Sequence, residues 1–278
     1  MVQTNCYICK SDSYTSFASI LNDSHGETFS IVECDCGFSY LNPRPKLEEM
    51  EKYYNTTDYH PHSKRNGLVY SIYKIVQKIT FRGKYKTLKK YTTTNIKHLD
   101  YGGGDGKFSK YLNLYNSVSS TSYDPYFSGS DSPDLKNNSF NVITLWHVLE
   151  HAYDLDLLFE NLERMLSDSG KLFIAVPNIN AIERKYFDTN WAAYDLPRHL
   201  YHFSSDSLER LLENKKYRII NKKRMLFDTF YISILSSKKG SAIAFIKSIL
   251  LSILISIRVL LQGPNYSSSL FYVCEKKN

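Results

Sequence analysis

The sequence predicts an α/β fold, because strand-like and helical segments alternate through the middle of the chain. A strand-like run at residues 96–99 leads into a group of glycines, and residues 107–115 then have the apolar spacing of a helix. A second strand-like run, residues 117–123, ends at Asp124, and a third covers residues 141–146. In open α/β folds, ligands bind at the carboxyl ends of such strands.

Length and composition allow one domain of about 200 residues and a smaller appendage. The chain has 278 residues, of which 42% are hydrophobic and 14% aromatic, so it can form a packed core and is not a disordered chain. No apolar segment follows Met1, so we expect no secretory signal. Five cysteines with two close pairs suit metal binding in a reducing compartment better than disulfides, and we expect a cytoplasmic protein.

The N-terminal part contains two cysteine pairs separated by 24 residues: Cys6 and Cys9, then Cys34 and Cys36. Four thiolates around a tetrahedral zinc ion can hold together a segment too short to fold on its own core. We therefore expect a zinc-ribbon-like module over residues 1–45. The second pair is one residue tighter than a usual zinc knuckle, which leaves His25 as an alternative fourth ligand. Free or buried cysteines without metal are the other interpretation.

Residues 46–94 are expected to form a basic helical cap. Between Tyr59 and Leu99 there are ten Lys or Arg and no Asp or Glu. Interleaved apolar residues predict a basic amphipathic helix, or a pair of helices, over residues 67–90. Such a surface attracts anions such as a nucleotide-sugar diphosphate, a lipid pyrophosphate, anionic lipid headgroups or RNA. A solvated helix face that covers the site is the alternative.

The glycine group follows an acidic residue in the order Asp100-Tyr101-Gly102-Gly103-Gly104-Asp105-Gly106. Glycines at a strand-to-helix turn let the backbone approach a ligand closely, and the acid can hold a hydroxyl or ammonium group. Asp124 lies about 18 residues past Gly106, near the spacing of a ribose-binding carboxylate. Together these features predict a site for a nucleoside-containing cofactor; a glycine-rich turn without a ligand is the alternative.

The next segments continue the alternation. The strand at residues 141–146 is followed by His147-Val148-Leu149-Glu150-His151 and by apolar residues at helical spacing up to Met165. We expect this helix to end at residues 167–170, with Gly170 as its C-terminal stop. Residues 171–176 form the next predicted strand, which closes at Pro177.

These motifs resemble those of class I S-adenosylmethionine-dependent methyltransferases. The single-residue gaps of Asp100-x-Gly102-x-Gly104-x-Gly106 are similar to the family's first motif, and the order strand, "VLEH", helix, "SGKL", strand, "VPN" is similar to its fourth and fifth motifs. The resemblance covers residues 95–225 and a final strand near residues 269–275. It implies a seven-stranded, mostly parallel Rossmann-like sheet with helices on both faces and an antiparallel last strand, over a domain at residues 95–278.

The resemblance also implies S-adenosylmethionine as the cofactor. The residues assigned to it are Asp100, Tyr101, Gly102, Gly104, Gly106, Asp124, Pro125, Trp146 and His147. The cysteine module, the "NPRP" turn at residues 42–45 and the paired Tyr53 and Tyr54 resemble one branch of the family. That branch includes sugar C-methyltransferases and enzymes of bacterial surface-polysaccharide biosynthesis. The sugar C-methyltransferases carry a further C-terminal domain, for which this chain is too short.

Methyl transfer needs an acceptor held in line with the leaving sulfur and, where the acceptor carries a proton, a base to remove it. His147, Glu150 and His151 follow a strand directly and are the best-placed titratable groups. We expect His151 to be the general base, because imidazole titrates near neutral pH, with Glu150 orienting it or acting itself. The resemblance supports a Glu-His pair at this position. The alternative is that Glu150 caps the next helix and His151 only packs.

A second cluster of polar and aromatic residues spans residues 191–203 and leads into a helix opened by Ser204. In similar enzymes this segment borders the acceptor pocket. We expect Arg198 to bind a phosphate or carboxylate, His199 to contact the acceptor hydroxyl, and Tyr201 to line the acceptor site. A packed aromatic loop with a solvated Arg198 is the alternative.

Residues 241–261 predict an amphipathic helix inserted before the last strand. Their longest uncharged run has ten residues, well short of the ~20 needed to span a bilayer. Lys247 and Arg258 fall on one side of a helical wheel, with an opposing apolar stripe made of Ile243, Ile246, Leu250, Ile253, Ile257 and Leu260. We expect this stripe to pack on the core or in a homodimer, with a membrane surface as the alternative.

The sequence thus predicts S-adenosylmethionine-dependent methyl transfer to a small or carbohydrate-type acceptor, a nucleotide sugar or glycan intermediate. One alternative is a membrane-associated methyltransferase for a quinone-like or polyprenyl-linked acceptor. Another is an RNA-associated binding protein, which the lack of an RNA-recognition signature disfavours.

Overall fold

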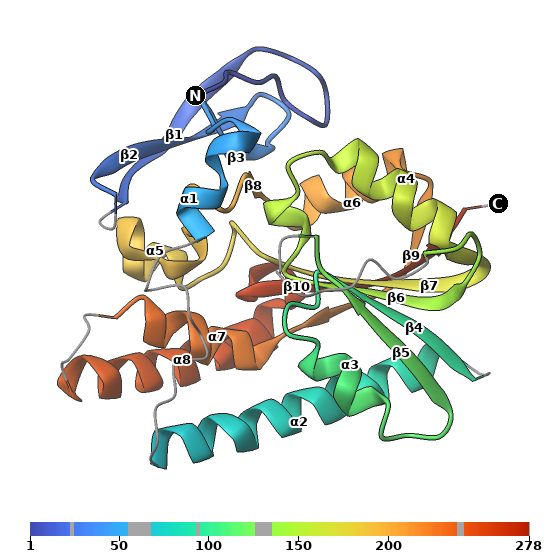
Figure 1. The fold of residues 1–278 in the computed structure, drawn as a ribbon. Coiled ribbons are helices and arrows are strands. Elements are labelled where there is room, and N and C mark those ends of the chain that lie inside the picture. Colours follow the sequence, from blue (N-terminus) through green and yellow to red (C-terminus); the bar gives the residue numbers. More distant parts are fainter. Residues whose placement is uncertain (23–24, 55–67, 93–94, 126–134, 238–241, 278) are drawn as a thin grey trace.

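The computed structural model contains two sheets, and the larger one forms the centre of the molecule (Figure 1). It describes residues 1–22, 25–54, 68–92, 95–125, 135–237 and 242–277. The central sheet has the strand order β5-β4-β6-β7-β10-β9. The bounds of these strands are β4 Ile96–Tyr101, β5 Val118–Tyr123, β6 Phe140–Trp146, β7 Leu166–Pro177, β9 Tyr217–Arg224 and β10 Ser269–Lys276.

The pairing in this sheet agrees with the predicted mostly parallel topology. β4 pairs in parallel with β5 and β6, and β6 with β7. β10 runs antiparallel to both β7 and β9, as expected for the last strand. The expected count of seven strands is not met: within the described residues the sheet has six. β5 is its edge there, and residues 126–134 lie outside the described part of the chain.

Helices cover both faces of the central sheet (Figure 1). Their bounds are α2 Leu68–Tyr91, α3 Lys107–Leu112, α4 Leu155–Met165, α6 Ser205–Asn214, α7 Leu226–Leu235 and α8 Ala242–Gln262. Side chains of a strand alternate between faces, so Leu172 and Ile174 of β7 join the core under α4 and α6. Phe173 and Ala175 join the core under α2 and α3. Both faces are therefore buried, which suits the apolar run of β7.

The helix ends follow local capping chemistry. The Asp154 carboxylate accepts a hydrogen bond from the Leu157 amide at 3.0 Å, so α4 begins at Leu155. Glu150 is therefore not the cap of this helix, and that alternative is wrong. Ser204 caps α6, as predicted, by accepting from the Ser207 amide at 3.1 Å.

The predicted stop at Gly170 is wrong. The helix α4 ends at Met165, and Gly170 lies inside β7 rather than at a left-handed cap. A Cβ on Gly170 would lie 2.6 Å from a methyl of Leu166, closer than any normal contact. The glycine is therefore required by close packing within the strand, a reason that its sequence neighbours do not reveal.

The smaller sheet joins the N-terminal part to a later segment of the chain. Its order is β1-β2-β3-β8, with bounds β1 Tyr14–Asn22, β2 Glu27–Cys34, β3 Ser39–Leu41 and β8 Tyr201–His202. β8 pairs antiparallel with β3, and the rings of Phe38 and Tyr201 stack with centroids 5.9 Å apart. The predicted module at residues 1–45 thus shares its sheet and its core with a segment that lies between β7 and β9 in the sequence.

The two predicted amphipathic helices are both present. The basic segment forms one helix, α2, and the part of the prediction at residues 59–67 lies outside the described residues. The segment at residues 241–261 forms α8. No described helix combines the length and the apolar character that a membrane crossing requires. Two short helices, α1 Glu51–Tyr54 and α5 Arg184–Phe187, lie near the smaller sheet (Figure 1).

Candidate active site

The glycine loop connects β4 to α3 at the carboxyl end of the central sheet. Gly102, Gly104 and Gly106 have φ values of +72°, +54° and +69°, which L-residues with side chains rarely adopt. A Cβ on Gly102 would lie 2.5 Å from Val148, whereas nothing lies within 4 Å of the corresponding position on Gly104. The loop is packed against the protein at Gly102 and open at Gly104, so a ligand can approach the backbone at Gly104.

Asp124 lies directly beside this loop. Its carboxylate accepts a hydrogen bond from the Gly104 amide at 2.9 Å, and the Tyr123 carbonyl accepts one from Gly102 at 2.7 Å. The ends of β4 and β5 therefore meet at the loop, as the predicted cofactor site requires. Pro125 follows in an exposed position. A contact between Asp124 and a ribose stays a prediction.

Asp100 lies beneath the loop rather than on its surface. It is 2% exposed, and Thr144 donates a hydrogen bond to its carboxylate at 2.7 Å. Burial raises the pKa of Asp100 to about 6, although Thr144 and the charge of Lys84 oppose that shift. The neighbouring Tyr101 packs its ring against Tyr123, with centroids 5.4 Å apart.

His147 follows β6 and lies between two carboxylates. Its φ is +58°, and its ring nitrogens lie 3.3 Å from Glu150 and 3.2 Å from Asp228 of α7. Burial alone would lower the pKa of His147, but the hydrogen bond with Asp228 and the charge of Glu150 outweigh burial and raise it to about 10. His147 is therefore an imidazolium at neutral pH and cannot act as a base there.

Glu150 is completely buried in a short 3₁₀ turn at Leu149–His151. Among the described residues, neither of its carboxylate oxygens accepts a hydrogen bond of good geometry, and its nearest cation is His147. A buried carboxylate is costly for folding unless it is paired, and the charged His147 supplies that pairing here.

His151 is neutral and partly buried. Its Nδ1 lies 3.1 Å from the Arg198 carbonyl oxygen and 3.2 Å from the Tyr54 hydroxyl. A carbonyl only accepts, so Nδ1 carries the proton and Nε2 keeps a lone pair. Burial, helped by the nearby His199, lowers the pKa of His151 to about 4. The ring is therefore neutral at neutral pH, with an unprotonated Nε2.

The second predicted cluster lies next to His151. The rings of His151 and His199 are 4.5 Å apart, and His199 donates from Nδ1 to the Ala193 carbonyl at 2.9 Å. Arg198 pairs with Asp195 through its guanidinium, with one N···O distance of 3.1 Å. Arg198 is thus engaged within the protein and not simply solvated.

Two predicted site residues have clear packing roles. Tyr201 is 7% exposed, packs against Phe38 and accepts a hydrogen bond from Arg44 at 3.2 Å. Trp146 stacks on Phe271 with centroids 5.4 Å apart. These contacts account for both rings, and their contacts with an acceptor or cofactor stay predictions.

Three site residues were missed by reasoning from the sequence. Tyr54 was noted only as part of a tyrosine pair, yet it contacts His151. Asp228 is the one charged residue of its helix, a signal that could have been used. Lys84 holds its ammonium 3.8 Å from the Trp146 ring centroid, and burial lowers its pKa to about 8 against the attraction of Asp100. In the sequence, Lys84 is one of many basic residues of the same helix, so nothing distinguishes it from the others.

Glu150, His151 and His199 also offer ligand atoms within 4.8 Å of one another. Such a set could hold a divalent cation as well as a proton. The second cluster of this kind consists of the four cysteines.

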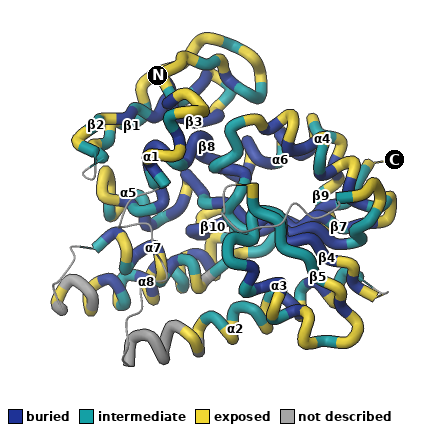
Figure 2. The backbone as a smooth tube through the Cα atoms, in the orientation of Figure 1, coloured by how far each residue is buried: buried dark blue, intermediate teal, exposed yellow. Residues whose placement is uncertain are grey.

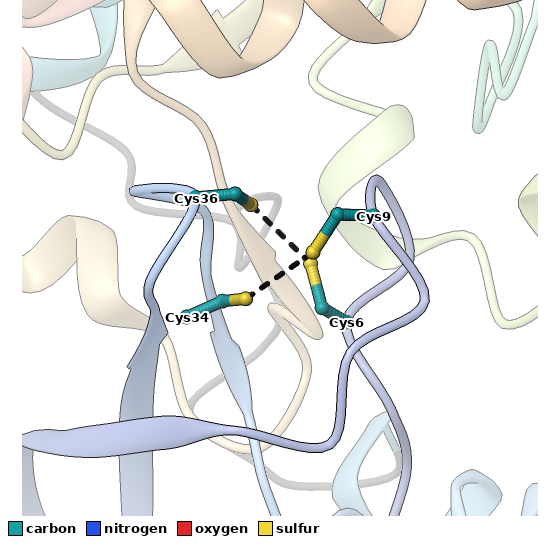
Figure 3. Close-up of side chains that lie close together, drawn as sticks. All are labelled: Cys6, Cys9, Cys34 and Cys36. Atoms are coloured by element: carbon teal, nitrogen blue, oxygen red, sulfur yellow. Dashed lines mark hydrogen bonds between the residues drawn. The ribbon is translucent and has the colours of Figure 1, made fainter.

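The four cysteines converge on one point (Figure 3). Cys6 and Cys36 have sulfurs 3.6 Å apart, and Cys9 and Cys34 have sulfurs 3.4 Å apart. Zn–S bonds of about 2.3 Å in a tetrahedron place sulfurs at roughly this separation. The tight C-x-C pair therefore does not prevent a four-cysteine site. His25 lies elsewhere, with its ring 4.9 Å from that of Tyr53.

Comparison with known proteins agrees with this geometry. A family model described as "Methyltransferase domain" matches residues 73–222, which is more than half of the chain. No curated protein matches the sequence.

Solved structures with a similar fold include three methyltransferases. An S-adenosylmethionine-dependent methyltransferase from Archaeoglobus fulgidus is 16% identical, with 72% of this chain and 94% of that chain covered and a TM-score of 0.44. One from Mesorhizobium loti is 12% identical, with coverages of 69% and 97% and a TM-score of 0.43. Phosphoethanolamine N-methyltransferase 2 from Haemonchus contortus is 16% identical, with a TM-score of 0.44.

The match to the Haemonchus contortus protein covers 71% of this chain and 53% of that one. This chain therefore spans about half the length of that protein. At these scores the structural likenesses carry no argument about the acceptor. The match to the family model, which includes the glycine loop, Asp124 and the histidine cluster, does identify the family. The chain belongs to the methyltransferase-domain family.

Proposed function

We propose that the enzyme methylates a hydroxyl-bearing small acceptor of carbohydrate type, with His151 as the general base. The observation that carries this proposal is the contact of the His151 ring: the Arg198 carbonyl accepts from Nδ1, which leaves Nε2 unprotonated on a ring that lies in a cluster with Glu150 and His199. A base in that state suits an acceptor that must lose a proton.

The cofactor site that we propose consists of the glycine loop, Asp124 and the end of β6. The open position at Gly104 and the adjacent Asp124 carboxylate fit a nucleoside with a free amino-acid end. S-Adenosylmethionine supplies a methyl group on a sulfonium, which leaves as a neutral thioether. Asp124 would hold the ribose hydroxyls, and the open backbone at Gly104 would lie against the amino-acid end.

During the reaction, the proton of the acceptor would pass to Nε2 of His151 while the new bond to the methyl carbon forms. Glu150 would stabilise the resulting imidazolium through its buried negative charge. Tyr54 would keep the ring oriented through its contact with Nδ1. His147 would stay charged throughout, since two carboxylates hold its proton.

The carbohydrate class rests on the resemblance of the cysteine module and the paired tyrosines to the sugar C-methyltransferase branch. The polar surroundings of His151 support it, because hydroxyl acceptors need hydrogen-bond partners such as His199 and Tyr54. Arg198 and Tyr201 are the proposed acceptor contacts. A lipid-linked acceptor is the second candidate, and the exposed apolar side of α8 favours it.

We also propose that the four cysteines bind a structural zinc ion. Their sulfur separations fit a tetrahedral site, and Cys6 and Cys34 are buried. A zinc ion there would fix the loop before β1 to the turn after β2. Because β3 pairs with β8, this would also steady the segment that carries Arg198 and His199.

A methyl-transfer screen with labelled S-adenosylmethionine tests the acceptor class. The panel would contain nucleotide sugars, lipid-linked glycans, ethanolamine phosphates and RNA, with a chelator in parallel reactions. We expect transfer to a sugar-containing acceptor, unaffected by brief chelation. Transfer confined to the amine or RNA substrates would contradict the proposal. Loss of activity on chelation, with the zinc content of the protein unchanged, would indicate a catalytic cation at Glu150, His151 and His199.

A further inference from the structure

The helix α8 has its apolar side turned outward. Its large apolar residues Ile246, Leu250, Leu254 and Ile257 are 58%, 57%, 60% and 49% exposed. Exposed residues recur along its length (Figure 2). The expectation that its stripe packs on the core of this chain is therefore wrong.

The side of α8 that meets the protein is partly polar. Ser248 and Ser252 are 3% and 0% exposed, and Ser252 donates a hydrogen bond to the Ser248 carbonyl at 2.7 Å. Ile255 and Val259 are the buried apolar residues next to them. A helix in water normally has the opposite arrangement. Burying serines while exposing leucines is reasonable only if something apolar covers the outer side.

The neighbouring helix α7 also exposes large apolar residues. It packs against α8, and its residues Phe227, Tyr231 and Leu235 are 56%, 58% and 51% exposed. We call the exposed apolar residues of α7 and α8 the outer face. An outer face built from two adjacent helices is larger than the scattered apolar residues of an ordinary protein surface.

The charged residues beside the outer face indicate what kind of surface covers it. Lys247 and Arg258 are exposed and lie about 60–80° from Leu250 around the helix axis, at the border of the apolar stripe and not opposite it as expected from the sequence. The helix α2, on the same lower side of the sheet in Figure 1, adds exposed cations at Lys74, Lys78, Arg82 and Lys86. None of these three helices contains Glu, and the single Asp, Asp228, is paired with His147.

We propose that the outer face docks on the surface of an anionic lipid bilayer, with α8 lying in the plane of the membrane. Apolar residues bordered by cations are the pattern of an interfacial helix, and anionic headgroups supply the negative charge that α7, α8 and α2 lack. A second copy fits less well, because a two-fold contact would bring Lys247 and Arg258 toward the same cations of the other chain.

Docking in this orientation would hold the enzyme at the membrane without spanning it, in agreement with the absence of a spanning helix among the described residues. It goes beyond the proposed reaction and does not depend on it, since a membrane-bound enzyme can act on either soluble or lipid-linked acceptors.

Flotation of the full-length protein with vesicles tests this proposal. The vesicles would consist of phosphatidylcholine with or without phosphatidylglycerol. We expect the wild type to float with the anionic vesicles and Leu250→Glu to bind them about tenfold less, since it places a charge in the apolar layer. The matched control is Leu157→Glu, because Leu157 of α4 is also an exposed leucine, at 55%, on the other face of the sheet.

Further variants and a second measurement separate the occupants. Lys247→Gln should weaken binding to anionic vesicles about fivefold, through the loss of one cation near the surface. S-Adenosylhomocysteine binding by each variant shows that it is folded. A wild type that does not float, equal flotation of Leu250→Glu, or equal binding to neutral vesicles would overturn the proposal. A dimer in light scattering that Leu250→Glu dissociates, without flotation, would assign the outer face to a second copy.

Discussion

His151 acquires its proposed role from its neighbours rather than from its own chemistry. The Arg198 carbonyl selects the tautomer, and burial keeps the ring neutral. The sequence allows His151 to be nominated as a base, because it follows a strand end together with Glu150. It does not show that His147, only four residues earlier, is held charged by Asp228 from a distant helix.

Replacing His151 by alanine should lower kcat about 10²- to 10⁴-fold, the usual contribution of a general base. Binding of S-adenosylhomocysteine, measured by calorimetry, should stay within about twofold, because His151 lies outside the proposed cofactor site. His25→Ala is the matched control, since this histidine packs against Tyr53 away from the site. Unchanged turnover in His151→Ala would exclude His151 as the base.

The pH dependence of kcat/KM provides a second test of His151. A base works only when deprotonated, and burial lowers the pKa of His151 to about 4. Activity should therefore persist as the pH falls below 6.5, where a solvent-exposed histidine would already be protonated, and decline only toward pH 4. An acidic limb near pH 6.5 would mean that His151 is solvated in the active enzyme.

At the scale of whole elements, the sequence predicts most of the central sheet. Glycine spacing and apolar periodicity locate β4, α3, β5, β6 and α4, because each of these signals is local. The pairing of β8 with β3 could not be predicted, since it joins residues about 160 positions apart through a strand of two residues. The orientation of α8 was also missed, because a helical wheel shows two sides without showing which one meets the protein.

Replacing Cys9 by serine should reduce zinc content, measured by atomic emission, from about one ion per chain to well below it. The melting temperature should fall as well, because metal binding contributes to folding of the N-terminal part. Cys274→Ala is the control: Cys274 is buried in β10, outside the cysteine cluster, and its loss should leave the zinc content unchanged. Wild-type protein purified without zinc would contradict the proposed site.

At the scale of the whole molecule, buried ionisable groups link stability to pH. Burial lowers the pKa of His98 to about 3 and that of His202 to about 3. Burial raises the pKa of Asp100 to about 6 and that of Glu183 to about 7. The histidines cost stability as the pH falls below 6.5, because the unfolded chain then binds protons that the folded chain cannot. The two carboxyl groups act in the opposite direction, so the effects partly cancel.

The contribution of His98 to stability can be measured by comparing the wild type with a variant at two pH values. His98 is fully buried and hydrogen-bonded to Ser120 and Thr144, and its neutral form is retained well below pH 6.5. His98→Gln cannot take up a proton in either state. Urea unfolding at pH 7 and pH 5 should therefore show a smaller stability loss for the variant, by about 2 kcal/mol. Equal losses would mean that His98 is protonated in the folded protein.

The glycine loop and Asp124 are the basis of the whole interpretation, and calorimetry with S-adenosylhomocysteine tests them most directly. We expect the wild type to bind, and Asp124→Ala to bind about 10- to 100-fold more weakly, as expected for the loss of hydrogen bonds to a charged group. Asp168→Ala is the control, since this carboxylate is 92% exposed at the start of β7. Equal binding by wild type and Asp124→Ala, or no binding by folded wild type, would contradict the assignment of this cofactor site.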